Sequence, residues 1–109
     1  MKLFIALKDN NGMDSIVDER FGRANYFAVY DLDKDELVEI FENSWKNQEH
    51  GVGIKTSTIA IEKGCDVAIG AKPGPKAEEV LRSGKMDFFE IKGISLKQSV
   101  EEYKKFKGD

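Results

Sequence analysis

The 109-residue sequence is poor in metal-binding side chains, with one cysteine, Cys65, and one histidine, His50. A single cysteine excludes a disulfide within the chain, and it excludes any metal site built from several thiolates of one chain. A single histidine excludes zinc chemistry that needs several histidines from one protomer. A metal ion bound by one chain would therefore not be coordinated by several thiolates or several imidazoles.

The sequence also lacks an excess of positive charge and a long apolar run. Its 17 basic residues are outnumbered by 20 acidic ones, giving a formal net charge of −3, whereas general affinity for nucleic acid needs a basic face. No apolar run approaches the ~20 residues of a membrane span, and residues 1–8 lack the cleavage signal of a secreted protein. We therefore expect no nucleic-acid partner, no membrane association and a cytoplasmic location.

Apolar and β-branched stretches predict five strands. Residues 2–7 are apolar on both faces, which is typical of a central strand that is covered on both sides. Residues 25–32 and 37–42 are predicted to be strands joined by a short polar turn, and so to form an antiparallel hairpin. Two further strands are predicted over residues 65–70 and 86–91.

Helical spacing of apolar residues predicts three helices. The first covers residues 52–63, and Gly64 stands where a glycine typically ends a helix. The second begins at Pro75, a residue suited to the first turn of a helix. Ser95 and Gln98 form a capping box at the start of the third helix. Its expected buried stripe consists of Leu96, Val100, Tyr103 and Phe106.

The predicted order β-β-β-α-β-α-β-α is that of a single mixed α/β domain with helices on both faces of one sheet. If the second strand runs against the other four, the long loops 9–23, 43–53 and 71–76 share one edge of the sheet. The opposite edge then holds only short turns. Because ligands of open α/β sheets bind beyond the carboxyl ends of the parallel strands, we expect the functional site at the edge with the long loops.

The loops at this edge have the chemistry of an anion site. Arg20 and Arg23 flank Gly22, so two guanidinium groups can clamp an anion while backbone N–H groups approach it. The glycines before the first two helices leave free N–H groups and a favourable dipole for negative charge. The residues expected to bind the anion are Arg20, Gly22, Arg23, His50, Gly51, Gly53, Lys72, Gly74 and Lys76.

More ordinary roles are open to some of these side chains. In a simple surface loop, the two arginines would pair with the neighbouring carboxylates of Asp14, Asp18 and Glu19. Cys65 enters a strand at the opposite edge, and a lone cysteine in that position is more typical of a small buried hydrophobe than of a metal ligand.

Three motifs of the chain resemble a known family. They are DSxVDxRFGRAxYF at residues 14–27, HGxGI at residues 50–54 and GPKA at residues 74–77. They are similar to motifs of the dinitrogenase iron–molybdenum cofactor biosynthesis family, and the resemblance covers essentially the whole chain. It implies one domain over residues 1–109 with a ribonuclease-H-like five-stranded sheet in the order 3-2-1-4-5.

The same resemblance implies a function and partners. Family members bind, hold or hand over an iron–sulfur or iron–molybdenum type cluster, often as small accessory proteins, so cluster-biosynthesis proteins are the expected partners. Members often carry His-Gly-His-Gly before the first helix, whereas this chain has Gln48 and Glu49 in place of the first pair. His50 is therefore the one candidate metal ligand that the resemblance transfers. The sequence leaves the oligomeric state open.

Two other functions are compatible with the residues. A small enzyme acting on an anionic metabolite would need a general base, which His50 or a loop carboxylate would supply. A protein-interaction or regulatory module would use an exposed Trp45 or Phe21 as its anchor. A nuclease is disfavoured, because two-metal nucleases need a carboxylate in the first strand and residues 2–7 have none. The sequence favours a non-catalytic carrier of an anionic cluster.

Overall fold

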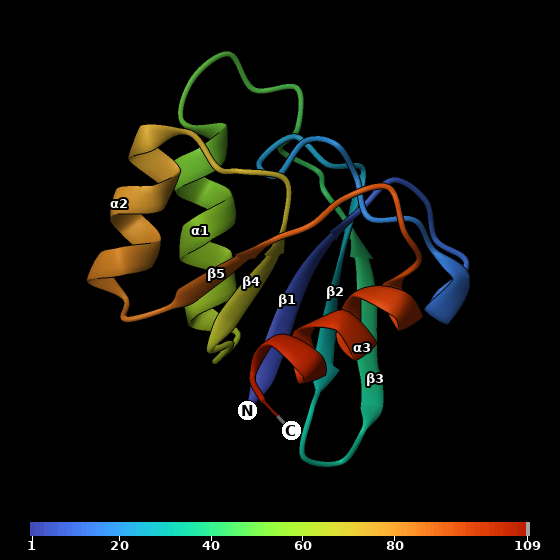
Figure 1. The fold of residues 1–109 in the computed structure, drawn as a ribbon. Helices are drawn as coiled ribbons and strands as arrows, with labels where there is room; N and C mark the ends of the chain where they lie inside the picture. Colours follow the sequence, from blue (N-terminus) through green and yellow to red (C-terminus); the bar gives the residue numbers. More distant parts are fainter. Residues whose placement is uncertain (109) are drawn as a thin grey trace.

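The computed structural model describes residues 1–108 and places five strands in one sheet with three α-helices (Figure 1). The strands are β1 (Lys2–Leu7), β2 (Tyr26–Asp31), β3 (Glu36–Glu42), β4 (Val67–Gly70) and β5 (Asp87–Glu90). The helices are α1 (Val52–Glu62), α2 (Pro75–Ser83) and α3 (Leu96–Phe106), preceded in the chain by a short 3₁₀ turn, η1 (Gly12–Asp14).

The sheet has the order β3-β2-β1-β4-β5. The strand β2 runs antiparallel to both β1 and β3, while β4 and β5 run parallel to β1. The predicted mixed sheet, its strand order and the reversed second strand are therefore confirmed. As a result, the loops after β1, β3 and β4 and the entry into β2 all lie at one edge.

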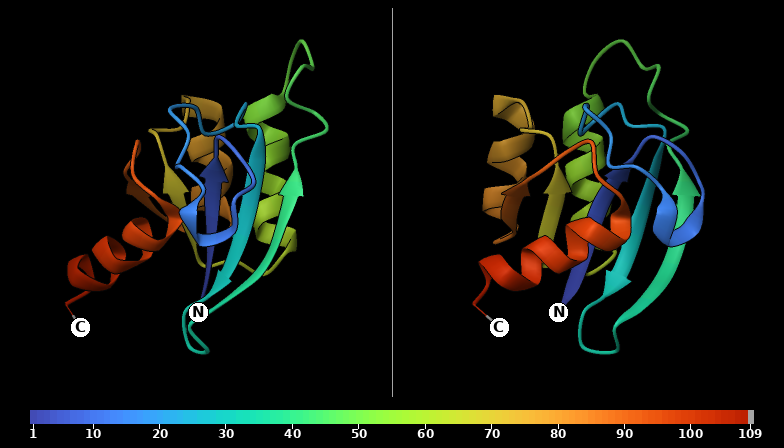
Figure 2. Two further views of the ribbon diagram at one scale, coloured as in Figure 1. Left: turned by 90° about the vertical axis from the view of Figure 1, so that its right-hand side faces the viewer. Right: turned by 45° about the vertical axis from the view of Figure 1, so that its right-hand side comes forward.

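The central strand β1 separates two apolar cores. Phe4 and Ala6 pack with residues of α1 and α2 on one face, while Leu3, Ile5 and Leu7 pack with residues of α3 on the other. Figure 2 shows α3 on the opposite side of the sheet from α1 and α2. Burying each of the large side chains contributes about 1.5–3 kcal/mol relative to leaving it in water, which explains why this strand is apolar on both faces.

The helix ends follow the local signals in the sequence. Gly51 precedes α1 in a left-handed conformation with φ 77°, and Gly64 follows it with φ 74°. Pro75 is the first residue of α2. The capping box of α3 is present, since the Ser95 hydroxyl accepts the Gln98 N–H at 3.1 Å and the Gln98 side chain accepts the Ser95 N–H at 3.1 Å.

The expected buried stripe of α3 is wrong at its last member. Leu96, Val100 and Tyr103 are buried, but Phe106 is 72% exposed. Its ring contacts those of Phe89 and Tyr103 on one side. Phe106 keeps the helical spacing of the stripe, but it is the last residue of α3, and spacing alone does not reveal where the covering sheet stops.

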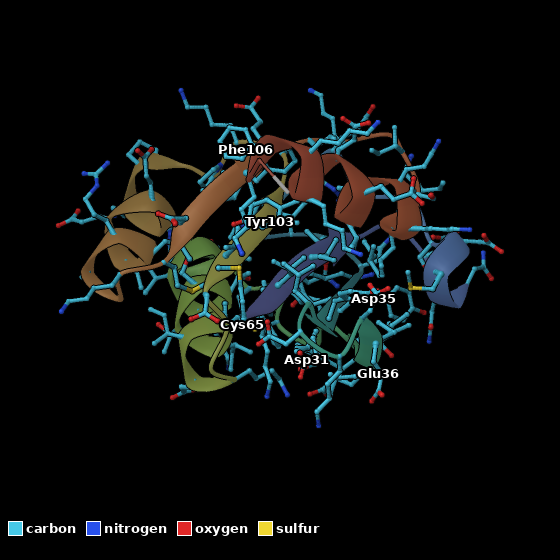
Figure 3. All side chains as sticks on the ribbon, turned by 60° about the horizontal axis from the view of Figure 1, so that its bottom comes forward. Asp31, Asp35, Glu36, Cys65, Tyr103 and Phe106 are labelled. Carbon is cyan, nitrogen blue, oxygen red and sulfur yellow. The ribbon has the colours of Figure 1, made fainter. Side chains whose placement is uncertain are left out.

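The edge opposite the long loops is seen in Figure 3. Cys65 lies there just before β4, and the carboxylates of Asp31, Asp35 and Glu36 gather where β2 passes into β3. Cys65 is buried, and burial raises the pKa of its thiol to about 11. A thiol with this pKa is protonated at neutral pH, so Cys65 acts as a small hydrophobe, as the sequence indicated. Among the described residues, no helix has the length and hydropathy of a membrane span.

Candidate functional site

A pocket of about 580 Å³ opens at the edge that carries the long loops. Three segments form its wall: the loop before β2, the N-terminus of α1 and the N-terminus of α2. The helices α1 and α2 both begin at the same end of the sheet (Figure 1). The residues that line it are Arg20, Gly22, Arg23, Gly51, Val52, Gly53, Ile54, Gly74, Pro75, Lys76 and Ala77.

The structure brings together most of the residues that the sequence predicted for the site. Seven of the nine line the pocket, whereas His50 and Lys72 are exposed and do not belong to its wall. That the seven residues bind a ligand stays a prediction. Sequence reasoning missed the apolar part of the wall, because these positions look like ordinary members of the two helices. They are Val52, Ile54, Pro75 and Ala77.

The three wall segments meet through residues with little or no side chain. A Cβ atom on Gly22 would lie 3.1 Å from the Cα of Gly53, and one on Gly53 would lie 3.1 Å from the Cβ of Ala77. Neither glycine has a positive φ. Both are needed for space rather than for backbone conformation, since a side chain at either position would push the segments apart.

The charged side chains on the pocket wall all have the same sign. Arg20, Arg23 and Lys76 line the pocket, and no carboxylate among the described residues does so. This is notable in a chain whose acidic residues outnumber its basic ones. A concave site lined by charges of one sign focuses its potential, and here that potential attracts anions.

Backbone N–H groups add to this potential. The first hydrogen bond within α1 is donated by Lys55 to the carbonyl of Gly51 at 2.9 Å. The N–H groups of residues 52–54 therefore have no partner within the helix. The helix α2 begins in the same way, with Glu78 donating to the carbonyl of Gly74 at 2.9 Å. Two helix N-termini thus present free N–H groups and positive dipole ends to one pocket.

The two arginines are held in different ways. The guanidinium of Arg20 is paired with Asp18, with Nε 3.3 Å from Oδ1 and Nη2 3.4 Å from Oδ2, and Asp18 itself is buried. Arg23 donates from Nη1 to the backbone carbonyl of Lys46 at 2.6 Å. The predicted surface pairing with a neighbouring carboxylate therefore holds for Arg20. Each guanidinium has five N–H donors, so donors are left over for a ligand in the pocket.

The aromatic side chains expected to be exposed anchors are buried, so that prediction is wrong. Trp45 is 7% exposed and stacks on Phe27, with ring centroids 5.7 Å apart, and its indole N–H donates to Thr56 at 2.8 Å. Phe21 is 3% exposed and packs edge-on against Phe88. Both lie in polar loops that fold back over the sheet, so the composition of the loops did not reveal their burial.

Side chains suited to binding a metal do not gather anywhere in residues 1–108: no group of three or more His, Cys, Asp or Glu residues is placed to hold an ion. Of the residues that the structure describes, none with a thiol, imidazole or carboxylate lines the pocket wall. The donor set therefore fits an anionic group held by charge and hydrogen bonds rather than a metal held by several protein ligands.

The fold and the site define a ribonuclease-H-like α/β domain with a cationic, glycine-lined pocket beyond the carboxyl ends of its parallel strands. A family model described as dinitrogenase iron–molybdenum cofactor matches residues 1–105, and the chain belongs to this family. The family resemblance seen in the three sequence motifs is confirmed.

Two solved structures are similar to the chain over most of its length. The apo form of the orange protein from Desulfovibrio gigas has a TM-score of 0.89 and 26% identity, covering 96% of this chain and 88% of that one. An NMR structure of a candidate NifB protein from Thermotoga has a TM-score of 0.81 and 25% identity, covering 95% and 87%. An uncharacterized protein of Methanocaldococcus jannaschii is 27% identical over 103 residues, or 93% of this chain and 83% of its relative.

Proposed function

We propose that this protein is a non-catalytic carrier that binds an anionic iron–sulfur or molybdenum-containing cluster, or a precursor of one, in the pocket between the Arg20–Arg23 loop and the two helix N-termini. The observation that carries this proposal is the sign of the wall charge: within residues 1–108, three cations and no carboxylate line the pocket, in a chain with net negative charge. The family places the chain in the context of iron–molybdenum cofactor biosynthesis. One structural neighbour is described as an apo form, a term kept for proteins that also exist with a bound group.

The geometry suits a cargo that has to leave again. A pocket of about 580 Å³ is within the range of small-molecule sites. Guanidinium, ammonium and backbone N–H groups would hold the sulfide or oxo surface of the cargo from outside, without a protein–metal bond from the wall. Release to a biosynthetic partner would then require no such bond to break. The described part of the wall also carries no imidazole or carboxylate to act as a general base, so the small-enzyme alternative gains no support from it.

The proposal predicts that Lys76 contributes to affinity while its neighbour Lys72 does not. In an anaerobic titration with tetrathiomolybdate, a dianion of molybdenum and sulfide with its own visible absorption, Lys76→Ala should weaken binding by about fivefold or more. Lys72→Ala removes the same charge from an exposed position off the wall and should change affinity by less than about twofold.

The same titration tests the candidate metal ligand. His50 is exposed and lies off the wall, so His50→Ala should leave both the affinity and the shape of the absorption band as in the wild type. A changed band would indicate a bond from imidazole to metal. Equal affinities for Lys76→Ala and Lys72→Ala would place the anion outside this pocket and contradict the proposal.

A further inference from the structure

Thr56, on the buried side of α1, connects two loops that are distant in the sequence. Its hydroxyl oxygen is 2.8 Å from the indole Nε1 of Trp45 and 2.9 Å from the carbonyl oxygen of Gly22. The indole N–H can only donate and the carbonyl can only accept, which fixes the direction of both bonds. The Thr56 hydroxyl must accept from Trp45 and donate to Gly22. Thr56 itself is fully buried.

This is not the bond that a threonine ordinarily makes inside a helix. Threonine hydroxyls in helices commonly donate to the carbonyl four residues earlier, and Thr58 of the same helix does so, donating to Ile54 at 2.8 Å. The hydroxyl of Thr56 instead leaves α1 and reaches the loop that carries the two arginines. Thr58, which is exposed, is therefore a natural control for Thr56.

The carbonyl of Gly22 is held from a second direction as well. The buried side chain of Asn43 donates from Nδ2 to this carbonyl at 3.0 Å and to that of Ala24 at 2.8 Å. Asn43 also accepts the backbone N–H of Trp45 at 3.2 Å. Two donors, Thr56 bonded to the indole of Trp45 and Asn43 bonded to its backbone N–H, thus fix the orientation of one carbonyl.

Fixing this carbonyl also fixes the next amide, because a peptide unit is planar and its C=O and N–H point in opposite directions. The Gly22 carbonyl points to Thr56, one helical turn beyond Gly53, while the pocket lies at the start of α1. The N–H of Arg23, a residue that lines the pocket, is therefore directed away from Thr56. Within residues 1–108, no protein acceptor takes this N–H.

We propose that Thr56, supported by Trp45, is a positioning residue for anion binding: it holds the Gly22–Arg23 peptide so that the Arg23 N–H donates to the bound anion. This inference rests on the proposed function of the pocket. Gly22 has no side chain to restrain its peptide, and a free glycine peptide flips easily. Without the Thr56 hydroxyl, Asn43 alone would hold the carbonyl, and turning the carbonyl toward the anion, which it would repel, would break one hydrogen bond instead of two.

The test compares three variants at a temperature well below their melting points. Thr56→Val keeps the shape of the side chain and removes the hydroxyl. It should bind tetrathiomolybdate about tenfold more weakly, because the hydrogen bond from the Arg23 N–H to the charged anion is lost. Thr56→Ser restores the hydroxyl and should bind within about threefold of the wild type. Thr58→Val, which loses only a bond within the helix, should bind like the wild type.

An NMR readout separates positioning from stability. On titration, the Arg23 amide proton should move downfield in the wild type and in Thr56→Ser, as expected for a new charge-assisted hydrogen bond, and it should stay in place in Thr56→Val. If Thr56→Val merely melts at a lower temperature, with unchanged affinity and an unchanged Arg23 shift, the positioning role is overturned while the proposed function stands. If the wild type binds no tetrathiomolybdate, both are overturned.

Discussion

Replacing Gly22 with alanine is expected to weaken tetrathiomolybdate binding by about tenfold or more and to lower the free energy of unfolding by about 1–3 kcal/mol. The added Cβ would lie 3.1 Å from the Cα of Gly53, a backbone atom that cannot rotate away. The Arg20–Arg23 loop must then separate from the start of α1. That movement, a few tenths of an ångström, would widen the pocket and stretch the bond from Thr56 to the Gly22 carbonyl, so the arginines and the α1 N–H groups would fit one ligand less well.

Gly74→Ala is the matched comparison for stability. Gly74 lines the same pocket, but a Cβ there meets nothing within 4 Å and φ is −66°. Gly74→Ala should lower the free energy of unfolding by only about 0.5–1 kcal/mol, because alanine is a poorer helix N-cap residue than glycine. Chemical denaturation measures both losses, and anaerobic titration measures the affinity of Gly22→Ala. Gly22→Ala would contradict the close-contact explanation if it bound like the wild type and unfolded like Gly74→Ala.

Reversing the charge of Arg23 is expected to have the largest effect on affinity, with Arg23→Glu weakening tetrathiomolybdate binding by about 100-fold. The substitution removes a cation from the wall and adds a carboxylate to a site where residues 1–108 place none. Two unit charges 4 Å apart interact by about 4 kcal/mol at an effective dielectric constant of 20. Even a partly screened repulsion between the new carboxylate and the anion is therefore large enough for a loss of affinity of about 100-fold. Arg23 is exposed, so the free energy of unfolding should change by less than about 1 kcal/mol.

Arg82→Glu provides the control for net charge. Arg82 lies on α2, is exposed and pairs with Glu78 at 2.9 Å, but it does not line the pocket. Its reversal changes the net charge of the chain by the same amount as Arg23→Glu. Because separated surface charges are screened by salt, Arg82→Glu should weaken binding by less than about threefold at 0.15 M ionic strength. Equal effects of the two reversals would show that overall charge, rather than this pocket, governs binding.

The fold could be predicted from the sequence because its strongest signals are local. The strand β1 is apolar on both faces, Gly64 and the Ser95–Gln98 capping box mark helix ends, and the short turn before β3 makes a hairpin. Each of these signals depends on a few neighbouring residues. The edge that carries the pocket followed from the strand directions alone, and this is why most of the predicted binding residues lie on one wall.

The features that sequence missed depend on contacts between distant residues. Thr56 looks like an ordinary helix residue, and its partner Gly22 is 34 residues away. Trp45 lies in a polar loop, and nothing local shows that Phe27 and Thr56 cover it. His50 directly precedes Gly51 of the wall, but its own position is exposed. Proximity in sequence did not determine which side chains reach the pocket.

The most direct test of the central claim is a ¹H–¹⁵N NMR titration of the wild-type protein with tetrathiomolybdate under anaerobic conditions. Binding in the pocket predicts that the largest amide shifts fall on Arg23, Gly53 and Ala77, one from each wall segment. The amides of the β2–β3 turn, at the opposite edge, should not move. The absence of saturable shifts, or shifts concentrated away from these three segments, would contradict the account.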